Sequence, residues 1–189
     1  MPQMFPNDLL CRSILFPKSW PNDVFDIEAL LRLDSVDKNV HALSVASRYL
    51  LETVDGAHKY GCRAAVAGNK RLEEKNQRPP APVAEAIHYL GFYDMRYGAV
   101  TDISLNYYEI QIRWRFENGE DAHFQIELHP KSGDSTERQR KAERAAARAL
   151  LATCLAGPYR HICACDEAFR QDLETIEMTE FAFEQLGMI

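Results

Sequence analysis

The sequence predicts an α+β fold: a three- to four-stranded, mostly antiparallel sheet with helices packed on one face, an extended N-terminal arm and an acidic helical C-terminus. Residues 107–116 and 122–128 look like strands, and the second segment alternates strictly between apolar and polar side chains. Residues 37–55 and 135–156 instead repeat apolar side chains every three or four positions, as one face of a helix does. The 189 residues, 46% of them hydrophobic, are enough to bury a core.

The first 25 residues are expected to form an extended arm. Four of the nine prolines of the chain lie in this stretch, and proline fixes φ and withholds an N–H donor. The arm also carries four aromatic residues, Phe5, Phe16, Trp20 and Phe25. We expect these rings to pack on the same chain, with packing on a partner as the alternative.

The region between the arm and the middle strands is predicted to be mainly helical. A helix over 37–55 would begin at Asp37 as its N-cap, and a second helix would run over 57–72. A proline-rich break follows, because proline pushes its predecessor out of the helical region. We expect a short helix over 83–90 and a strand over 99–104 after that break.

The two middle strands are predicted to form a hairpin around Asn118-Gly119. A three-residue loop, with Gly119 in the left-handed conformation of a bulge, puts all apolar residues of both strands on one face, and burial specifies register strongly. The expected pairs are Trp114 with Ala122, Ile112 with Phe124, Ile110 with Ile126 and Tyr108 with Leu128, which leaves Gln111 and Gln125 on the polar face.

A helix over 135–156 is expected after the hairpin, with Asp134 as its N-cap and Glu137 completing a capping box. Its alanines at positions 145, 149, 152 and 156 would let it lie close to the apolar sheet face. A strand over 159–165 and two short acidic helices, over 167–176 and 179–186, would complete the chain.

These elements divide the sequence into an arm (1–25), a single α+β domain (26–165) and an acidic helical segment of the same domain (166–189). Residues 166–189 hold seven acidic side chains and one basic one, so the rest of the chain holds 21 of each. The net charge of −6 therefore belongs to the C-terminal segment.

The expected hairpin register places Glu109 opposite Glu127, with His129 and Lys131 just beyond. Facing carboxylates are destabilising, and beside a histidine they can bind a divalent metal or act as an acid–base pair. The usual antiparallel pattern favours a simpler interpretation, in which this face is solvated. The order helix, three strands, helix, strand resembles the core of the PD-(D/E)xK nuclease-like fold, with Glu127-Leu128-His129 at the Glu-x-Lys position. This resemblance implies a metal-dependent phosphodiesterase or nuclease.

The five cysteines are expected to be reduced, because their number is odd and the N-terminus does not resemble a secretory signal. Cys154, His161, Cys163 and Cys165 are zinc-ligand types within a short stretch, but buried free thiols are the favoured interpretation. His58 and Cys62 lie four residues apart and could form a thiolate–imidazole pair on a helix.

The helix over 135–156 carries a row of like charges, Arg140, Arg144 and Arg148, at a spacing of four residues. Such a row is unfavourable unless something acidic faces it. The acidic C-terminal segment is the favoured candidate, and nucleic-acid phosphates are the alternative.

The leading interpretation is a non-enzymatic cytoplasmic binding protein, such as an adaptor, a chaperone-like protein or an inhibitor, with no cofactor. Its partner would be another protein, for example a basic nucleic-acid-binding protein recognised by the acidic segment. Direct nucleic-acid binding is disfavoured because most of the chain is not basic, a homo-oligomer stays open, and no apolar run reaches the about 20 residues of a membrane span. The candidate binding residues are Arg140, Arg144, Arg148, Phe169, Glu177, Glu180, Phe181, Phe183 and Glu184.

The alternative function is the metal-dependent phosphodiesterase or nuclease. Its catalytic residues would be Glu109, Glu127, His129 and Lys131, and its cofactor a divalent metal ion.

Overall fold

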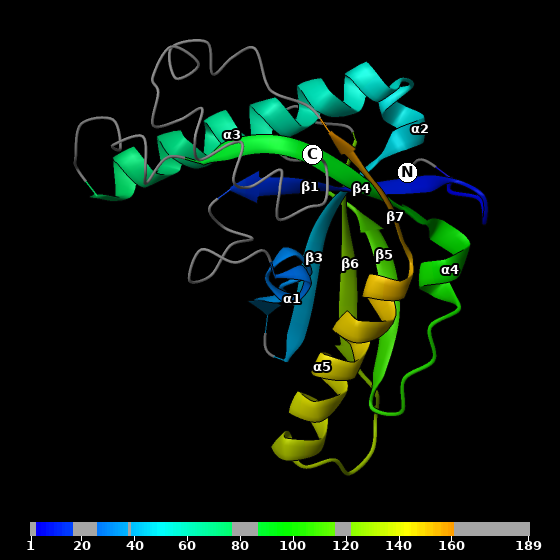
Figure 1. The fold of residues 1–189 in the computed structure, drawn as a ribbon. Coiled ribbons are helices and arrows are strands. Elements are labelled where there is room, and N and C mark those ends of the chain that lie inside the picture. Colours follow the sequence, from blue (N-terminus) through cyan, green and yellow to red (C-terminus); the bar gives the residue numbers. More distant parts are fainter. Residues whose placement is uncertain (1–2, 17–25, 38, 77–86, 116–121, 161–189) are drawn as a thin grey trace. The chain divides into compact units, whose positions relative to one another are not determined.

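The computed structural model describes residues 3–16, 26–37, 39–76, 87–115 and 122–160 (Figure 1). These residues form an α+β fold with a seven-stranded sheet, which is larger than the three or four strands predicted. The strands pair in the order β5-β6-β3-β1-β4-β7, with β2 joined to β3. The strands are β1 (Leu9–Phe16), β2 (Asp34–Asp37), β3 (Val40–Ser47), β4 (His88–Arg96), β5 (Tyr108–Trp114), β6 (His123–Pro130) and β7 (Leu155–Arg160). The helices are α1 (Ile27–Leu30), α2 (Arg48–Leu51), α3 (Val54–Asn76), α4 (Tyr97–Thr101) and α5 (Glu137–Thr153).

The chain divides into two compact units, which we describe in turn. Unit 1 contains Met1–Arg12, Leu31–Thr53 and Asp94–Gly157. Unit 2 contains Ser13–Leu30, Val54–Tyr93 and Pro158–Ile189. Unit 1 therefore holds the antiparallel strands β2, β3, β5 and β6 with α2, α4 and α5, whereas unit 2 holds α1, α3 and most of β4.

The centre of unit 1 is β3, and the helix predicted over 37–55 is wrong. β2 and β3 form an antiparallel hairpin, and Asn39 between them has φ 64°, a left-handed conformation that asparagine tolerates better than most residues. β3 also pairs with β1 and β6, and both of its faces contribute buried residues. Apolar residues on both faces of a central strand lose the two-residue alternation, which explains why the spacing in the sequence imitated a helix.

The predicted N-terminal arm is in part a sheet strand. Leu9–Phe16 form β1, which lies between β3 and β4 in the strand order, with Leu10 opposite Ser47 and Cys11 opposite Ala46. Leu10, Cys11 and Ile14 are buried, whereas Phe5 is exposed. Trp20 and Phe25 lie outside the described residues.

The hairpin of β5 and β6 is present, and its two faces are the ones predicted, but its register differs by two residues. Trp114 lies opposite Phe124, and Ile112 lies opposite Ile126, on the apolar face; Gln111 and Gln125 share the other face. A shift of two residues leaves every side chain on its own face, so burial cannot distinguish the two registers. The Arg115 N–H donates to the carbonyl of His123 at 2.8 Å, which continues the observed register one pair beyond Trp114 and Phe124.

Helix α5 is shorter than predicted and presents a different face to the sheet. Its N-cap is Thr136 rather than Asp134, and Gln139 completes the capping box that was expected of Glu137. Its buried residues are Glu143, Ala147 and Leu151, four positions apart, whereas Ala145 and Ala149 are exposed. Ala147 packs in a core cluster with Leu105, Tyr108 and Leu128.

The buried Glu143 carboxylate joins α5 to the start of β5. Its two oxygens accept the backbone N–H groups of Asn106 and Tyr107, the second at 2.6 Å. Nearby, Lys131 Nζ donates to the carbonyl of Leu105 at 2.6 Å, and Gln139 donates to the Tyr107 hydroxyl at 3.0 Å. Because Glu143 makes two of these hydrogen bonds from a buried position, its loss would leave two backbone donors without their acceptor.

The strand predicted over 99–104 is also wrong, since Tyr97–Thr101 form α4. The backbone at its start is already engaged: Tyr97 N–H donates to Asp8 O at 2.8 Å and Gly98 N–H to Pro6 O at 2.9 Å. α4 contacts β5 and lies along its outer side (Figure 1). β5 is the last strand in the order, so α4 shields part of an edge that would otherwise present free backbone groups.

In unit 2, the helix predicted over 57–72 is present with wider bounds as α3, and Gly61 in its interior has a packing role. A Cβ at this position would lie 2.0 Å from Tyr89 Cε2, so only glycine lets the tyrosine ring lie this close to the helix backbone. His58 Nδ1 lies 3.0 Å from the Tyr89 hydroxyl, and Asn69 bonds both backbone groups of Ile87. Cys62, Ala65, Ile87 and Tyr89 form the buried core of this unit.

The helix predicted over 83–90 is wrong from His88 onward, where β4 begins. Every residue from His88 to Met95 is buried, so this strand too lacks the alternation that identifies a half-buried one. β7 covers Leu155–Arg160, so it begins four residues before the strand predicted over 159–165 and overlaps it at 159–160. Residues 83–86, 161–165 and the predicted helices over 167–176 and 179–186 lie outside the described residues.

Glu143→Ala should lower the free energy of unfolding by about 2–4 kcal/mol, because two backbone donors lose a charged acceptor. Urea denaturation followed by circular dichroism measures this loss. The matched control is Glu137→Ala, which removes an exposed carboxylate from the same helix and should cost much less. Equal losses for the two variants would contradict the role assigned to Glu143.

Candidate functional site

The β5–β6 hairpin carries three of the four candidate catalytic residues, Glu109, Glu127 and His129. In the observed register Glu109 lies opposite His129, and Glu127 lies opposite Gln111. The predicted facing of Glu109 and Glu127 is therefore wrong, because the observed register is shifted by two residues from the predicted one. β6 also pairs with β3 on its other side, where Glu127 lies opposite Ala42.

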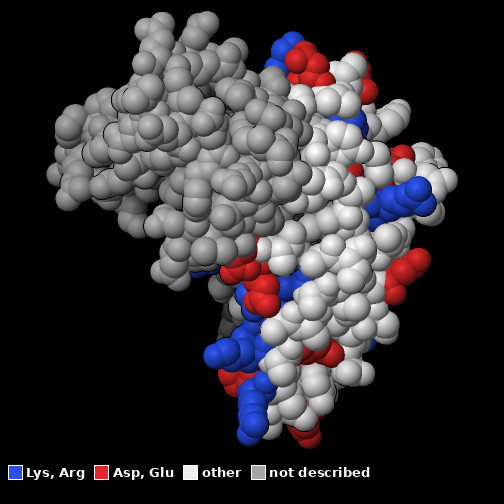
Figure 2. All heavy atoms as spheres, viewed as in Figure 1, with Lys and Arg blue, Asp and Glu red and all other residues white. Residues whose placement is uncertain are grey.

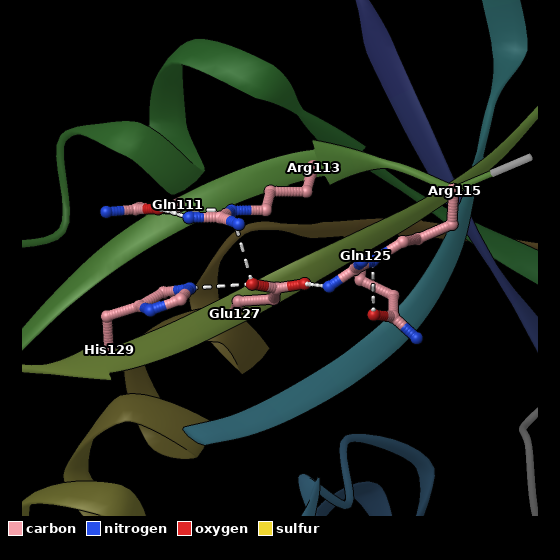
Figure 3. Close-up of polar contacts among 6 residues, drawn as sticks. All are labelled: Gln111, Arg113, Arg115, Gln125, Glu127 and His129. Atoms are coloured by element: carbon pink, nitrogen blue, oxygen red, sulfur yellow. Dashed lines mark hydrogen bonds and ion pairs between the residues drawn. The ribbon is translucent and has the colours of Figure 1, made fainter. Parts of the chain in front are cut away.

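Glu127 is the centre of this face (Figure 3), and its side chain is only 1% exposed. Arg115 Nη2 donates to Oε1, whereas His129 Nε2 lies 2.6 Å from Oε2. Arg113 Nε lies 3.4 Å from the same Oε2 atom. Both carboxylate oxygens are thus engaged by cationic or proton-donating side chains, so this part of the face is not simply solvated.

The electrostatics of Glu127 follow from this arrangement. Burial alone would raise the pKa of its carboxyl, but the hydrogen bonds from Arg115 and His129, with the charges of Arg115 and Arg113, hold the pKa below its ordinary value. Glu127 is therefore ionised at neutral pH, and it neutralises its basic neighbours instead of repelling another carboxylate.

Two glutamines complete the network. Gln111 Oε1 accepts hydrogen bonds from Arg113 Nε at 3.2 Å and Nη2 at 2.8 Å, and Gln125 Oε1 accepts one from Arg115 Nε at 3.0 Å. Each guanidinium is thus held by an amide oxygen as well as by Glu127. Figure 3 shows both amide nitrogens turned away from the guanidinium groups.

The other residues of the nuclease interpretation do not join Glu127. Glu109 is exposed, and Lys131 directs its ammonium to the carbonyl of Leu105. Within the described ranges, no group of three or more His, Cys, Asp or Glu side chains lies close enough together to hold a metal ion. The hairpin thus brings Glu127 and His129 together, with two arginines in place of the second acid.

The arginine row on α5 finds partners within its own unit. Arg144 donates to Glu137 and to the Tyr108 hydroxyl, both at 2.8 Å, and Arg140 donates to Ser135 Oγ at 2.7 Å. Arg148 is half-buried. Figure 2 shows basic side chains interspersed with acidic ones around the N-terminal half of α5. The row therefore does not need the C-terminal segment to offset its charge.

The cysteine predictions have mixed outcomes. Cys11 and Cys154 are free thiols, but Cys62 is disulfide-bonded, so the expectation of five reduced cysteines is wrong, and Cys62 cannot serve as a thiolate beside His58. Burial raises the pKa of the Cys154 thiol. The zinc candidates His161, Cys163 and Cys165 lie outside the described residues, as do the binding candidates Phe169, Glu177, Glu180, Phe181, Phe183 and Glu184.

Sequence reasoning missed a second cluster, formed by Cys11 in β1, Arg48 in α2 and Asp94 in β4. Asp94 is almost fully buried, and Arg48 Nε lies 3.6 Å from its Oδ1 atom. Burial raises the pKa of Asp94 to about 6, which the charge of Arg48 only partly offsets. Burial and the Asp94 carboxylate raise the pKa of Cys11 to about 12, so its thiol is not a nucleophile. The signal in the sequence that could have revealed this cluster is Asp94, an acidic residue within the largely apolar segment that forms β4.

Comparison of the chain with protein-family models, with curated proteins and with solved structures gave no match. Among the described residues, no helix combines the length and apolarity needed to cross a membrane.

Glu127→Gln should lower the free energy of unfolding at pH 7 by about 2 kcal/mol or more, because two arginines lose their counter-charge and His129 loses its carboxylate hydrogen-bond partner. This reverses the expectation from facing carboxylates, under which the change would relieve repulsion. Glu109→Gln, on the same face but exposed, should change stability by less than about 0.5 kcal/mol. The depressed pKa of Glu127 also means that its stabilisation is present above pH 4.5 and is lost as the pH falls further. When the pH is lowered below 4.5, Glu127→Gln should lose less stability than the wild type, whereas Glu109→Gln should lose as much as the wild type.

Asp94 should produce a pH dependence of the opposite sign. Its pKa in the folded protein is about 6 against an ordinary 3.8, so the folded chain keeps a proton that the unfolded chain releases. Its contribution to stability is complete below pH 3.8 and is lost as the pH rises through about 6. Urea denaturation at pH 5, 6 and 7 measures the free energy of unfolding of wild type and of Asp94→Asn. The wild type should gain stability toward pH 5 relative to the variant, and the comparison cancels the titration of histidines because both proteins contain them. Parallel curves for the two proteins would contradict it.

Proposed function

We propose that the protein is a non-enzymatic binding protein that contacts a macromolecular partner through the polar face of the β5–β6 hairpin. The observation that carries this proposal is the way Glu127 is engaged. Both of its oxygens hold neighbouring side chains, while Arg113 and Arg115, which it fixes, are 50% and 39% exposed. Exposed arginines that a buried carboxylate holds in place are suited to binding a partner molecule.

Catalysis would require a different arrangement. A general base or metal ligand needs a lone pair directed at the substrate or ion. The oxygens of Glu127 are instead directed at Arg113, Arg115 and His129. By contrast, side chains that are already held in place lose little conformational entropy when a partner binds them, which favours affinity.

The basic partner expected at the acidic C-terminal segment stays a prediction, because residues 166–189 lie outside the described part of the chain. The surface on β5 and β6 has the opposite charge, so the two predictions concern different partners. The metal-dependent nuclease stays the alternative function, and a single set of experiments can separate it from the binding protein.

Thermal melting of the full chain should give the same midpoint with and without Mn²⁺ or Mg²⁺, since a ligand of the folded state would raise it. A metal-induced rise that disappears in Glu127→Gln would favour the nuclease. In parallel, immobilised wild type, Arg113→Gln and Arg138→Gln are used to capture proteins from a lysate of the source cells. A partner held by wild type and Arg138→Gln, but lost with Arg113→Gln, supports the proposal. Arg138 is the matched control, because it is an exposed arginine on α5.

A further inference from the structure

On the polar face of β5 and β6, several side-chain acceptors are already bonded to donors of the same face, whereas other donors stay available. We define the donor face as Gln111, Arg113, Arg115, Gln125 and His129, around Glu127. The amide oxygens of both glutamines and both oxygens of Glu127 accept hydrogen bonds or approach cations from within this set. The amide nitrogens point away from these contacts in Figure 3. A ligand on this face therefore meets mainly N–H groups.

The guanidinium groups are restricted in how they can bind a further ligand. Arg113 uses Nε and Nη2 on Gln111, and Arg115 uses Nε on Gln125 and Nη2 on Glu127. The Nε and Nη2 atoms of each group are therefore engaged within the face, whereas Nη1 of each arginine has two further N–H donors. Each arginine can thus still donate to one acceptor group of a ligand, such as a carboxylate.

The spacing of these donors follows from the strand. Arg113 lies in β5 and Arg115 directly after it, two residues further along the extended chain, and a strand advances by about 3.3 Å per residue. An extended polypeptide places side chains on one side at the same interval of two residues. Carboxylates at every second position of such a chain would match the two arginines, and its backbone carbonyls would match the neutral amide donors of Gln111 and Gln125.

A nucleic acid fits this face less well. Single strands are held by aromatic side chains on which the bases stack, together with cations that follow the backbone. The donor face contains two arginines but no phenylalanine, tyrosine or tryptophan.

We propose that the donor face binds an extended acidic segment of a partner protein, with carboxylates at alternate positions. This inference rests on the proposed function, because it names the chemistry of the partner for the same surface. The exposed Glu109 at the start of β5 limits the acidic run to the arginine end of the strand. The partner's acidic residues should therefore lie over Arg113 and Arg115, and not over Glu109.

The test uses a fluorescein-labelled peptide of six Glu-Thr repeats, the same peptide with Lys in place of Glu, and a thymidine oligonucleotide of equal charge. Fluorescence polarisation with the full chain should detect the Glu-Thr peptide only, with affinity falling as salt rises. Arg113→Gln should weaken this binding about three- to tenfold, and Arg138→Gln should leave it unchanged. Glu109→Gln should leave it unchanged or strengthen it. Circular dichroism confirms that each variant is folded.

Each other outcome contradicts the inference in a defined way. Tighter binding of the oligonucleotide than of the Glu-Thr peptide would make the face a nucleic-acid site. Equal weakening by Arg113→Gln and Arg138→Gln would reduce the effect to net charge. Failure of the peptide to bind wild type would overturn the acidic-segment proposal. If a cellular partner were still captured through Arg113 in that case, the proposed function would survive; if not, both would fail.

Discussion

Burial of the Glu127 carboxylate is the constraint from which the candidate site follows. A charge removed from water must be matched by cations and hydrogen bonds, or the group becomes protonated. Here the match comes from Arg115 and His129 at hydrogen-bond distance, with Arg113 slightly further away. Satisfying that one carboxylate fixes three basic side chains on adjacent strands, and the arginines in turn orient Gln111 and Gln125. The buried Glu127 carboxylate thus orients the basic side chains on this face, and through the arginines it also orients the two glutamine amides.

A second buried carboxylate, Glu143, is satisfied in a different way. Both of its oxygens accept backbone N–H groups, those of Asn106 and Tyr107. The first arrangement leaves cationic groups at the surface, whereas the second leaves none, since its donors belong to the main chain. Two glutamates in the same unit therefore have different consequences: Glu143 holds a helix against a strand, and Glu127 organises a surface.

The sequence carried enough information for the faces of the hairpin but not for its register. Burial distinguishes the face of Trp114 and Phe124 from that of Gln111 and Gln125. It does not distinguish two registers that differ by two residues, which is why the predicted pairing of Glu109 with Glu127 is wrong. Strands β3 and β4 were mistaken for helices because residues on both of their faces are buried and no alternation marks them. The network around Glu127 could not be predicted either, since an isolated glutamate in an alternating strand is usually solvated. Asp94 raises the same difficulty, because its partner Arg48 lies in another element.

The place of β1 in the sheet has a consequence for how the chain folds. β1 precedes both β3 and β4 in the chain but lies between them in the sheet order, so neither neighbour exists when it is made. β3 begins at Val40 and can pair early, but β4 begins only at His88. One side of β1 must therefore wait until a long loop has closed, a step that topology makes slow. During that interval the free edge of β1 is open to pairing with a wrong strand, so the late arrival of β4 makes aggregation a hazard of folding.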